Sequence, residues 1–215
     1  MAKELDTQTL SDTEDSIFER EFDEMLKIQL PQRDIRDPFI QNKAYIKYAL
    51  QVAKGNSGPG GEFAGRGARG GQLGWNIGRA QELRGTGVSY NWEKTYAAAG
   101  WQDHLGSSGT PVQVNEDALI CVVGIATFAN SPKLTMCKAH VMGDDLSVEN
   151  LMPAFLRGTR IYTFQYPWLV TPKEYFYIRG YVQSVGDDEA TLLFVTFAKA
   201  SYLQSETAST QSGGT

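Results

Sequence analysis

Residues 117–129 read Asp-Ala-Leu-Ile-Cys-Val-Val-Gly-Ile-Ala-Thr-Phe-Ala and contain the longest apolar run in the chain. A run of this kind, without polar alternation, predicts a β-strand that is covered on both faces. It is shorter than the ~18 residues that a membrane-spanning helix requires. The sequence therefore predicts a buried strand here and no transmembrane segment.

Further β-type segments lie on both sides of this run. Leu134–Val141 is expected to be its hairpin partner, across a turn at Asn130-Ser131-Pro132. A second turn is expected at Gly186-Asp187-Asp188. About eight strands between residues 88 and 203 predict a β-sandwich or barrel. The other expected strands are Arg160–Tyr166, Tyr175–Val185, Ala190–Leu203, Val88–Trp92, Pro111–Val114 and Trp168–Val170.

The N-terminal part predicts two helices. A capping box at Ser11-Asp12-Thr13-Glu14 starts the first, over about residues 12–30. The apolar side of this helix must pack against this domain or against a neighbouring copy of the chain. We expect it to pack against the neighbouring copy. A second helix is expected over about 38–54, with Pro38 in its first position. The candidate assembly interface on the first helix consists of Phe18, Phe22, Met25 and Leu26.

Residues 55–87 hold 12 of the 22 glycines and are expected to form an arm that becomes ordered against a partner. Gly65-Arg66-Gly67-Ala68-Arg69-Gly70 matches the GxGxxG pattern, but no strand or helix signal surrounds it, which argues against dinucleotide binding. The stretch also resembles the Arg-Gly boxes of RNA-binding tails. Its net charge of +2 supports at most a weak contact with nucleic acid. The candidate arm contacts are Arg66, Arg69, Arg79 and Arg84.

Charge divides the chain into three parts. Residues 1–37 carry 11 acids and 5 bases, residues 38–87 carry 2 acids and 7 bases, and residues 88–215 carry 12 acids and 8 bases. This pattern indicates segments with different roles. Residues 1–16 are polar and acidic, so no signal peptide is expected. Residues 204–215 form a polar low-complexity tail.

The sequence contains no convincing catalytic, cofactor or metal motif. The soft metal ligands Cys121, Cys137, His104 and His140 do not form the two compact pairs of a zinc site. Whether the two cysteines pair is left open. Asp144-Asp145 and Asp187-Asp188-Glu189 are interpreted as solvated turns rather than cation sites. We therefore expect no enzyme, no cofactor and no bound metal.

Aromatic residues are densest between residues 162 and 181. Such rings pack in cores and subunit interfaces, and they also line ligand grooves. The candidate aromatic interface or groove comprises Tyr162, Tyr166, Trp168, Tyr175 and Tyr177.

The chain thus consists of an N-terminal arm over residues 1–87, a β domain over 88–203 and a polar tail over 204–215. The arm contains the two expected helices and the Gly/Arg-rich segment 55–87. This layout resembles that of the single jelly-roll coat proteins of icosahedral viruses. The resemblance implies a mainly β, antiparallel sandwich of the jelly-roll type that self-assembles into a capsid. It also implies a virion location after assembly in the host cytoplasm, and partners that are further copies or other capsid proteins. Arms in this family are usually basic, so the acidic residues 1–37 favour contact with shell proteins, or a position near an internal viral membrane.

Two other functions stay open at this point. A ligand- or carbohydrate-binding sandwich or barrel would use the aromatic segment 162–181 but would leave the N-terminal extension without a role. A cupin-like enzyme would need two or three histidines in its barrel, which two histidines in the whole chain fit poorly. The expectation is therefore a capsid subunit.

Overall fold

The computed structural model describes residues 18–57, 73–77, 83–84, 93–114, 118–141 and 143–199. The chain divides into two compact units, Met1–Asp37 and Pro38–Thr215. The first contains a helix over residues 18–29. Helix α2 (Arg33–Gln41) spans the boundary, and helices α3 (Lys43–Ser57) and α4 (Met152–Leu156) belong to the second unit.

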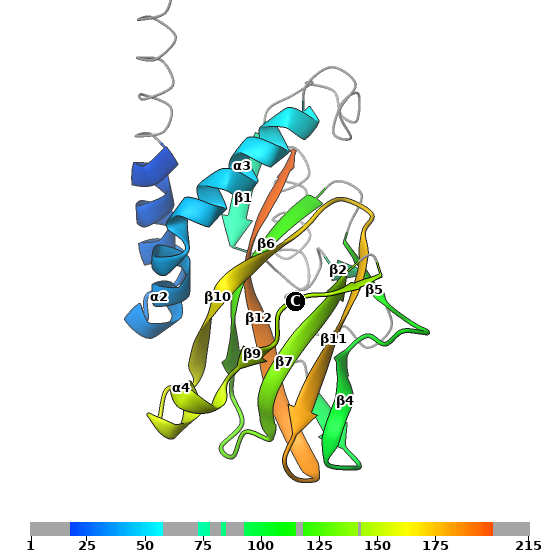
Figure 1. Ribbon diagram of the computed structural model, residues 1–215. Coiled ribbons are helices and arrows are strands. Elements are labelled where there is room, and N and C mark those ends of the chain that lie inside the picture. Colours follow the sequence, from blue (N-terminus) through cyan, green and yellow to red (C-terminus); the bar gives the residue numbers. More distant parts are fainter. Residues whose placement is uncertain are drawn as a thin grey trace, which may run out of the picture. The chain divides into compact units, whose positions relative to one another are not determined.

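Within the second unit, the described strands form two antiparallel sheets (Figure 1). In the five-stranded sheet the neighbours are, in order, β1 (Leu73–Ile77), β12 (Gly186–Lys199), β6 (Ala118–Thr127) and β10 (Ile161–Val170), and β3 (Glu93–Tyr96) also pairs with β12. In the seven-stranded sheet the order is β2 (Leu83–Arg84), β5 (Val112–Val114), β11 (Tyr175–Val182), β7 (Leu134–Val141) and β8 (Asp144–Asp145), with β4 (Gly100–Leu105) on β11 and β9 (Glu149–Asn150) on β7.

The order of these strands is that of a jelly roll. From β5 onward the chain crosses between the sheets at β5–β6, β6–β7, β9–β10, β10–β11 and β11–β12. Repeated crossing of this kind builds the two Greek keys of a jelly-roll sandwich. Apolar side chains of both sheets form one buried cluster between them. The expected mainly β sandwich is thereby confirmed.

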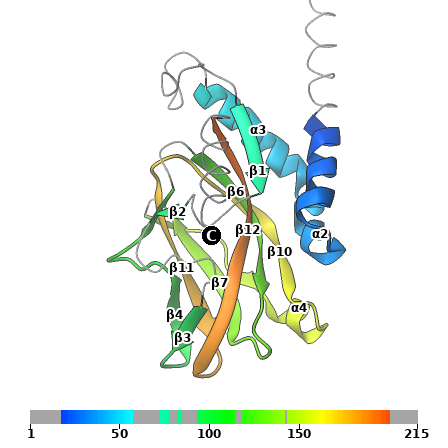
Figure 2. The same cartoon turned by 180° about the vertical axis from the view of Figure 1, so that it is seen from behind.

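Strand β6 lies between β12 and β10 in the five-stranded sheet. All ten of its residues are buried, as the unbroken apolar run predicts. Its inner side faces the seven-stranded sheet, and helix α3 packs against β1, β6 and β12 on the outer side (Figure 2). The helix presents buried residues at helical spacing, namely Ile46, Ala49, Leu50 and Ala53.

The turn between α2 and α3 is fastened to the sheet by one side chain. The amide Nδ2 of Asn42 donates to the carbonyl oxygens of Pro38, Val123 and Phe164 at 3.1, 3.4 and 3.4 Å. The last two acceptors lie where the β6–β10 register shifts between Thr163 and Trp168. A bulge leaves backbone groups unpaired, and here the Asn42 amide supplies the missing donor.

Strands β6 and β7 do not form the expected hairpin. Both edges of β6 are already hydrogen-bonded, one to β12 and the other to β10, so the chain must cross to the other sheet. Asp188 holds this crossing. Its Oδ2 accepts the backbone N–H groups of Lys133 and Leu134 at 2.8 Å each, and its Oδ1 accepts that of Glu189 at 2.9 Å.

The interpretation of residues 187–189 as a solvated turn is wrong, because Asp188 is buried. Its side chain is 2% exposed. Residues 186–189 pair with β3 as the first part of β12, and the bend lies at residues 183–185. A run of acids looks like a turn in sequence, but here one of the three carboxylates points inward to satisfy backbone donors.

The boundaries at the N-terminal side also differ from expectation. The helix expected over 38–54 is two helices, because the chain turns at Asn42, and Pro38 lies inside α2. Strands β1 and β2 come from the segment expected to be an arm and pair with β12 and β5, so the sandwich begins before residue 88. The capping box, the strand expected at Val88–Trp92 and the tail over 204–215 lie outside the described residues.

The role of Asp188 predicts the effect of a conservative substitution. Asp188→Asn replaces one acceptor oxygen by a donor, so at least one buried backbone N–H loses its partner. We expect the free energy of unfolding to fall by about 1–3 kcal/mol, measured by urea unfolding followed by circular dichroism. Asp187→Asn, next to it but exposed and bonded to the Thr95 hydroxyl, should change stability by less than about 0.5 kcal/mol. Equal effects of the two substitutions would contradict this role.

Candidate functional surfaces

The space between the sheets is occupied by apolar side chains from both of them. Cys121 and Cys137 are both buried and free rather than paired. Burial raises the pKa of the Cys121 thiol to about 12 and that of Cys137 further still, so neither is a reactive thiolate. Within the described part of the chain, no group of three or more His, Cys, Asp or Glu residues is placed to hold a metal ion.

One polar pair lies inside the sandwich. The Tyr96 hydroxyl and Nδ1 of His104 are 2.5 Å apart, and Nε2 of His104 has no hydrogen-bond partner among the described residues. His104 lies at the point where the pairing register between β4 and β11 shifts, and it is 7% exposed. Burial lowers the pKa of His104 to about 4, although the nearby Asp188 carboxylate acts in the opposite direction. The imidazole is therefore neutral near neutral pH.

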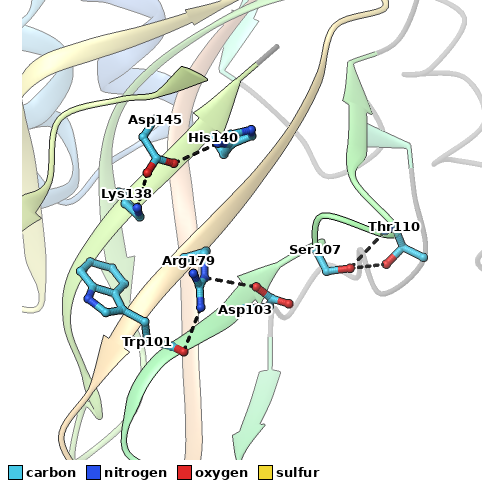
Figure 3. Close-up of polar contacts among 8 residues, drawn as sticks. All are labelled: Trp101, Asp103, Ser107, Thr110, Lys138, His140, Asp145 and Arg179. Atoms are coloured by element: carbon cyan, nitrogen blue, oxygen red, sulfur yellow. Dashed lines mark hydrogen bonds and ion pairs between the residues drawn. The ribbon is translucent and has the colours of Figure 1, made fainter. Parts of the chain in front are cut away.

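The outer face of the seven-stranded sheet carries polar and aromatic side chains, and Figure 3 shows Trp101, Asp103, Lys138, His140, Asp145 and Arg179 among them. Inward and outward residues alternate along β7 and β11, as the pleat of a strand requires. We call this surface the outer face and define it by Trp101, Asp103, Lys138, His140, Asp145, Tyr177, Arg179 and Tyr181.

Two carboxylates of the outer face each hold a neighbouring cation. Asp145 is bonded to Lys138 Nζ and lies 2.9 Å from His140 Nδ1. The bonds from Lys138 and from His140, in that order of importance, lower the pKa of Asp145. Asp103 Oδ1 lies 3.5 Å from Nε of Arg179, whose Nη2 donates to the Trp101 carbonyl at 3.1 Å. Each cation of the face is thus matched by a carboxylate.

Aromatic contacts connect these two ion pairs. His140 stacks on Tyr177 with 4.7 Å between ring centroids, and Trp101 meets Tyr181 edge-on at 5.7 Å. The Lys138 ammonium lies 5.5 Å from the centre of the Trp101 ring, a cation–π arrangement. The side chains of the outer face are therefore held in place before any partner arrives.

A second surface lies at one end of the sandwich. Two grooves, of about 780 and 240 Å³, flank the β6–β7 connection. The larger is also lined by the start of β12 and by β3, and the smaller by α4 and the residues after it. Three large apolar side chains are exposed on these connections: Phe128, Leu156 and Val185, with Leu156 78% exposed. We call these three residues the end patch.

The residues of the candidate assembly helix are mostly buried. Phe18, Phe22 and Leu26 are buried and Met25 is half-buried, with the Phe18 and Phe22 rings stacked 5.4 Å apart. On the same helix Ile28 is 81% exposed, a residue that the apolar periodicity did not single out. Among the described residues of this helix, Ile28 is the exposed large apolar side chain.

The candidate aromatic residues do not form one groove. Trp168 belongs to the core, and the Tyr162 hydroxyl donates to Glu149 Oε2 at 3.0 Å. Tyr166 is exposed on β10 of the five-stranded sheet, whereas Tyr175 and Tyr177 lie on β11 of the other sheet. The candidate arm contacts Arg66, Arg69 and Arg79 lie outside the described residues, and Arg84 is the second residue of β2.

Sequence reasoning missed the main residues of the outer face. Trp101, Asp103 and Arg179 come from strands that are adjacent only in the fold. The alternation of Lys138 and His140 with buried residues in β7 was a usable local signal. This alternation identifies the outward side chains of β7, but it does not show which strands lie next to β7.

Comparisons with models of protein families, with curated proteins and with solved structures gave no match. Among the described helices, none combines the length and the apolar character needed to cross a membrane.

The buried His104 predicts an acid-sensitive fold. Because its pKa is about 4 in the folded chain, against 6.5 for an unperturbed histidine, the unfolded chain takes up the proton first as the pH falls. Stability should therefore be complete above about pH 6.5 and decline by about 3 kcal/mol as the pH falls to 4. Urea unfolding at a series of pH values measures this slope.

His104→Gln removes the titrating group and should flatten the slope between pH 6.5 and 4. The chain has one other histidine, so His140→Gln on the outer face is the matched control and should keep the slope. A slope that persists in His104→Gln would rule out this origin.

Proposed function

We propose that this chain is a self-assembling structural subunit of a virus coat. The observation that carries the proposal is a jelly-roll sandwich whose interior is packed with apolar side chains. Jelly rolls serve as capsid, lectin and cupin domains. Because the interior of this sandwich is filled, any binding must take place on its outer surface. Contact with further copies of the chain is one such use of that surface.

The end patch supports a contact with a second copy. Val185 lines the larger groove. Phe128 directly precedes the groove-lining Ala129 in the chain, and Leu156 directly follows the groove-lining Phe155. Exposed apolar side chains that border grooves are a feature of protein interaction sites. A neighbouring subunit that covered them would remove this surface from water.

The N-terminal unit supports a second assembly contact. Residues 1–37 form a unit separate from the sandwich and carry a net charge of −6. The described helix in this unit exposes Ile28. An acidic segment is unsuited to neutralising a genome, so we assign this unit to contacts with other coat proteins. A position near an internal viral membrane is the alternative placement.

Substitution in the end patch tests the first contact. Leu156→Asp with Val185→Asp replaces two exposed apolar groups by charges, which should weaken self-association by at least about 100-fold, since burying each side chain contributes about 1.5–3 kcal/mol. Light scattering and negative-stain microscopy should show particles or defined multimers for the unaltered chain and monomers for the variant. Tyr48→Asp, at an exposed ring on α3, is the control and should assemble. A monomeric unaltered chain would contradict the proposal.

The N-terminal contact has a charge-matched test. Ile28→Asp and Lys27→Ala lower the net charge by the same amount at adjacent exposed positions, but the first alone removes the apolar group. We expect Ile28→Asp to reduce the particle size or yield measured by light scattering, and Lys27→Ala to leave both unchanged. Identical behaviour of the two variants would remove Ile28 from the assembly contact.

A further inference from the structure

We propose that the outer face of the seven-stranded sheet binds an uncharged carbohydrate. This binding activity would be separate from coat assembly, which we assign to the end patch and the N-terminal unit. Three features of the outer face support this binding: its balanced charges, its unused hydrogen-bonding capacity and its aromatic rings. Figure 3 shows the two ion pairs and Trp101.

The two sheets differ in how their outsides are covered. Helix α3 packs against the five-stranded sheet, and α4 against its strand β10. The side chains of the outer face remain partly exposed, with Asp145 at 52%, Asp103 at 43% and Arg179 at 39%. A ligand can therefore reach them without any change in the fold.

The charges of the outer face exclude a polyanion as its ligand. Lys138 and Arg179 are matched by Asp145 and Asp103, so the four side chains sum to zero charge. Nucleic acid is held mainly by excess positive charge and the release of counterions. A face without that excess favours a neutral ligand.

Each ion pair still has hydrogen-bonding capacity that faces outward. A carboxylate offers about four acceptor sites, and a guanidinium carries five N–H donors. Asp145 is engaged by two donors. Arg179 donates one hydrogen bond, from Nη2 to the Trp101 carbonyl, and its Nε forms an ion pair with Asp103 without a hydrogen bond. Hydroxyl groups donate and accept at the same atom, so a polyhydroxylated ring matches these mixed donors and acceptors.

The aromatic rings supply the apolar part of the same site. Trp101, Tyr177 and Tyr181 are held by the stacking and edge contacts described above. The negative face of an aromatic ring attracts weakly positive C–H groups, such as those on one side of a sugar ring. Because the fold already holds these groups, binding would cost little further side-chain entropy.

A second copy of the chain fits this face less well than a sugar does. Protein contact would desolvate two ion pairs, which is unfavourable unless they are re-paired across the interface. Exposed apolar groups that favour subunit contact lie in the end patch, and of the residues on the seven-stranded sheet and its connections Tyr175 and Val148 are exposed as well. Sugar hydroxyls would keep both ion pairs hydrogen-bonded.

Binding is tested on the full chain with defined oligosaccharides. Isothermal titration with cellohexaose, chitohexaose and maltohexaose measures neutral ligands, and sulfated dextran serves as the polyanion probe. We expect at least one neutral oligosaccharide to bind, with little dependence on salt. Failure of all three to bind, or salt-sensitive binding of sulfated dextran alone, would overturn the proposal.

Two variants place the binding on the outer face. Asp145→Asn changes an exposed acceptor without altering the core, and Tyr177→Ala removes a ring; each should weaken binding at least tenfold. Tyr166→Ala, which removes a more exposed ring on the five-stranded sheet, should bind normally. Unchanged binding by both outer-face variants would overturn the proposal. So would loss of multimers in Tyr177→Ala by light scattering, which would make the face a subunit interface.

Discussion

Strand β6 has no side that faces water, and the rest of the sandwich is arranged around that constraint. All ten of its residues are buried, so one layer must lie on each side of it. Helix α3 covers the outer side and the seven-stranded sheet the inner side. Gly124 allows strand β10 and helix α2 to lie close to β6, because a Cβ there would lie 2.4 Å from the Tyr162 carbonyl oxygen and 3.4 Å from the Pro38 side chain. The Asn42 amide then fastens the helical turn at the same place.

Because a helix covers β6, the outer surfaces of the two sheets differ in their exposure to solvent. The part of the five-stranded sheet that α3 covers becomes part of the interior, whereas Tyr166 on β10 stays exposed. The outer face of the seven-stranded sheet keeps charged and aromatic groups in contact with solvent. Those groups are paired with one another, so the face is hydrophilic and its side chains are held by their mutual contacts. The exposed apolar side chains Phe128, Leu156 and Val185 lie on connections at one end. This separation allows one surface to meet a hydrated ligand and another to meet a copy of the chain.

The crossings between the sheets depend on polar groups that are buried rather than exposed. Asp188 accepts three backbone N–H groups where β6 leads into β7 and β12 begins. Tyr96 and His104 form a further buried polar contact on β3 and β4. Buried polar groups are costly unless they are paired. Because burial lowers the pKa of His104, this part of the sandwich is expected to be sensitive to proton uptake by His104.

The sequence by itself determined the buried character of residues 118–127, the helices near the N-terminus and the mainly β architecture. These features follow from local apolar runs and periodicities, which record whether a segment meets water or the core. Only the tertiary structure decided that β7 leaves β6 and crosses to the other sheet, that Asp188 points inward, and that Trp101, Lys138 and Arg179 share one face. The pairing of strands depends on which sheet edges remain unoccupied, and no local pattern encodes that. The outer face could therefore be recognised only after the strands that build it had been placed side by side.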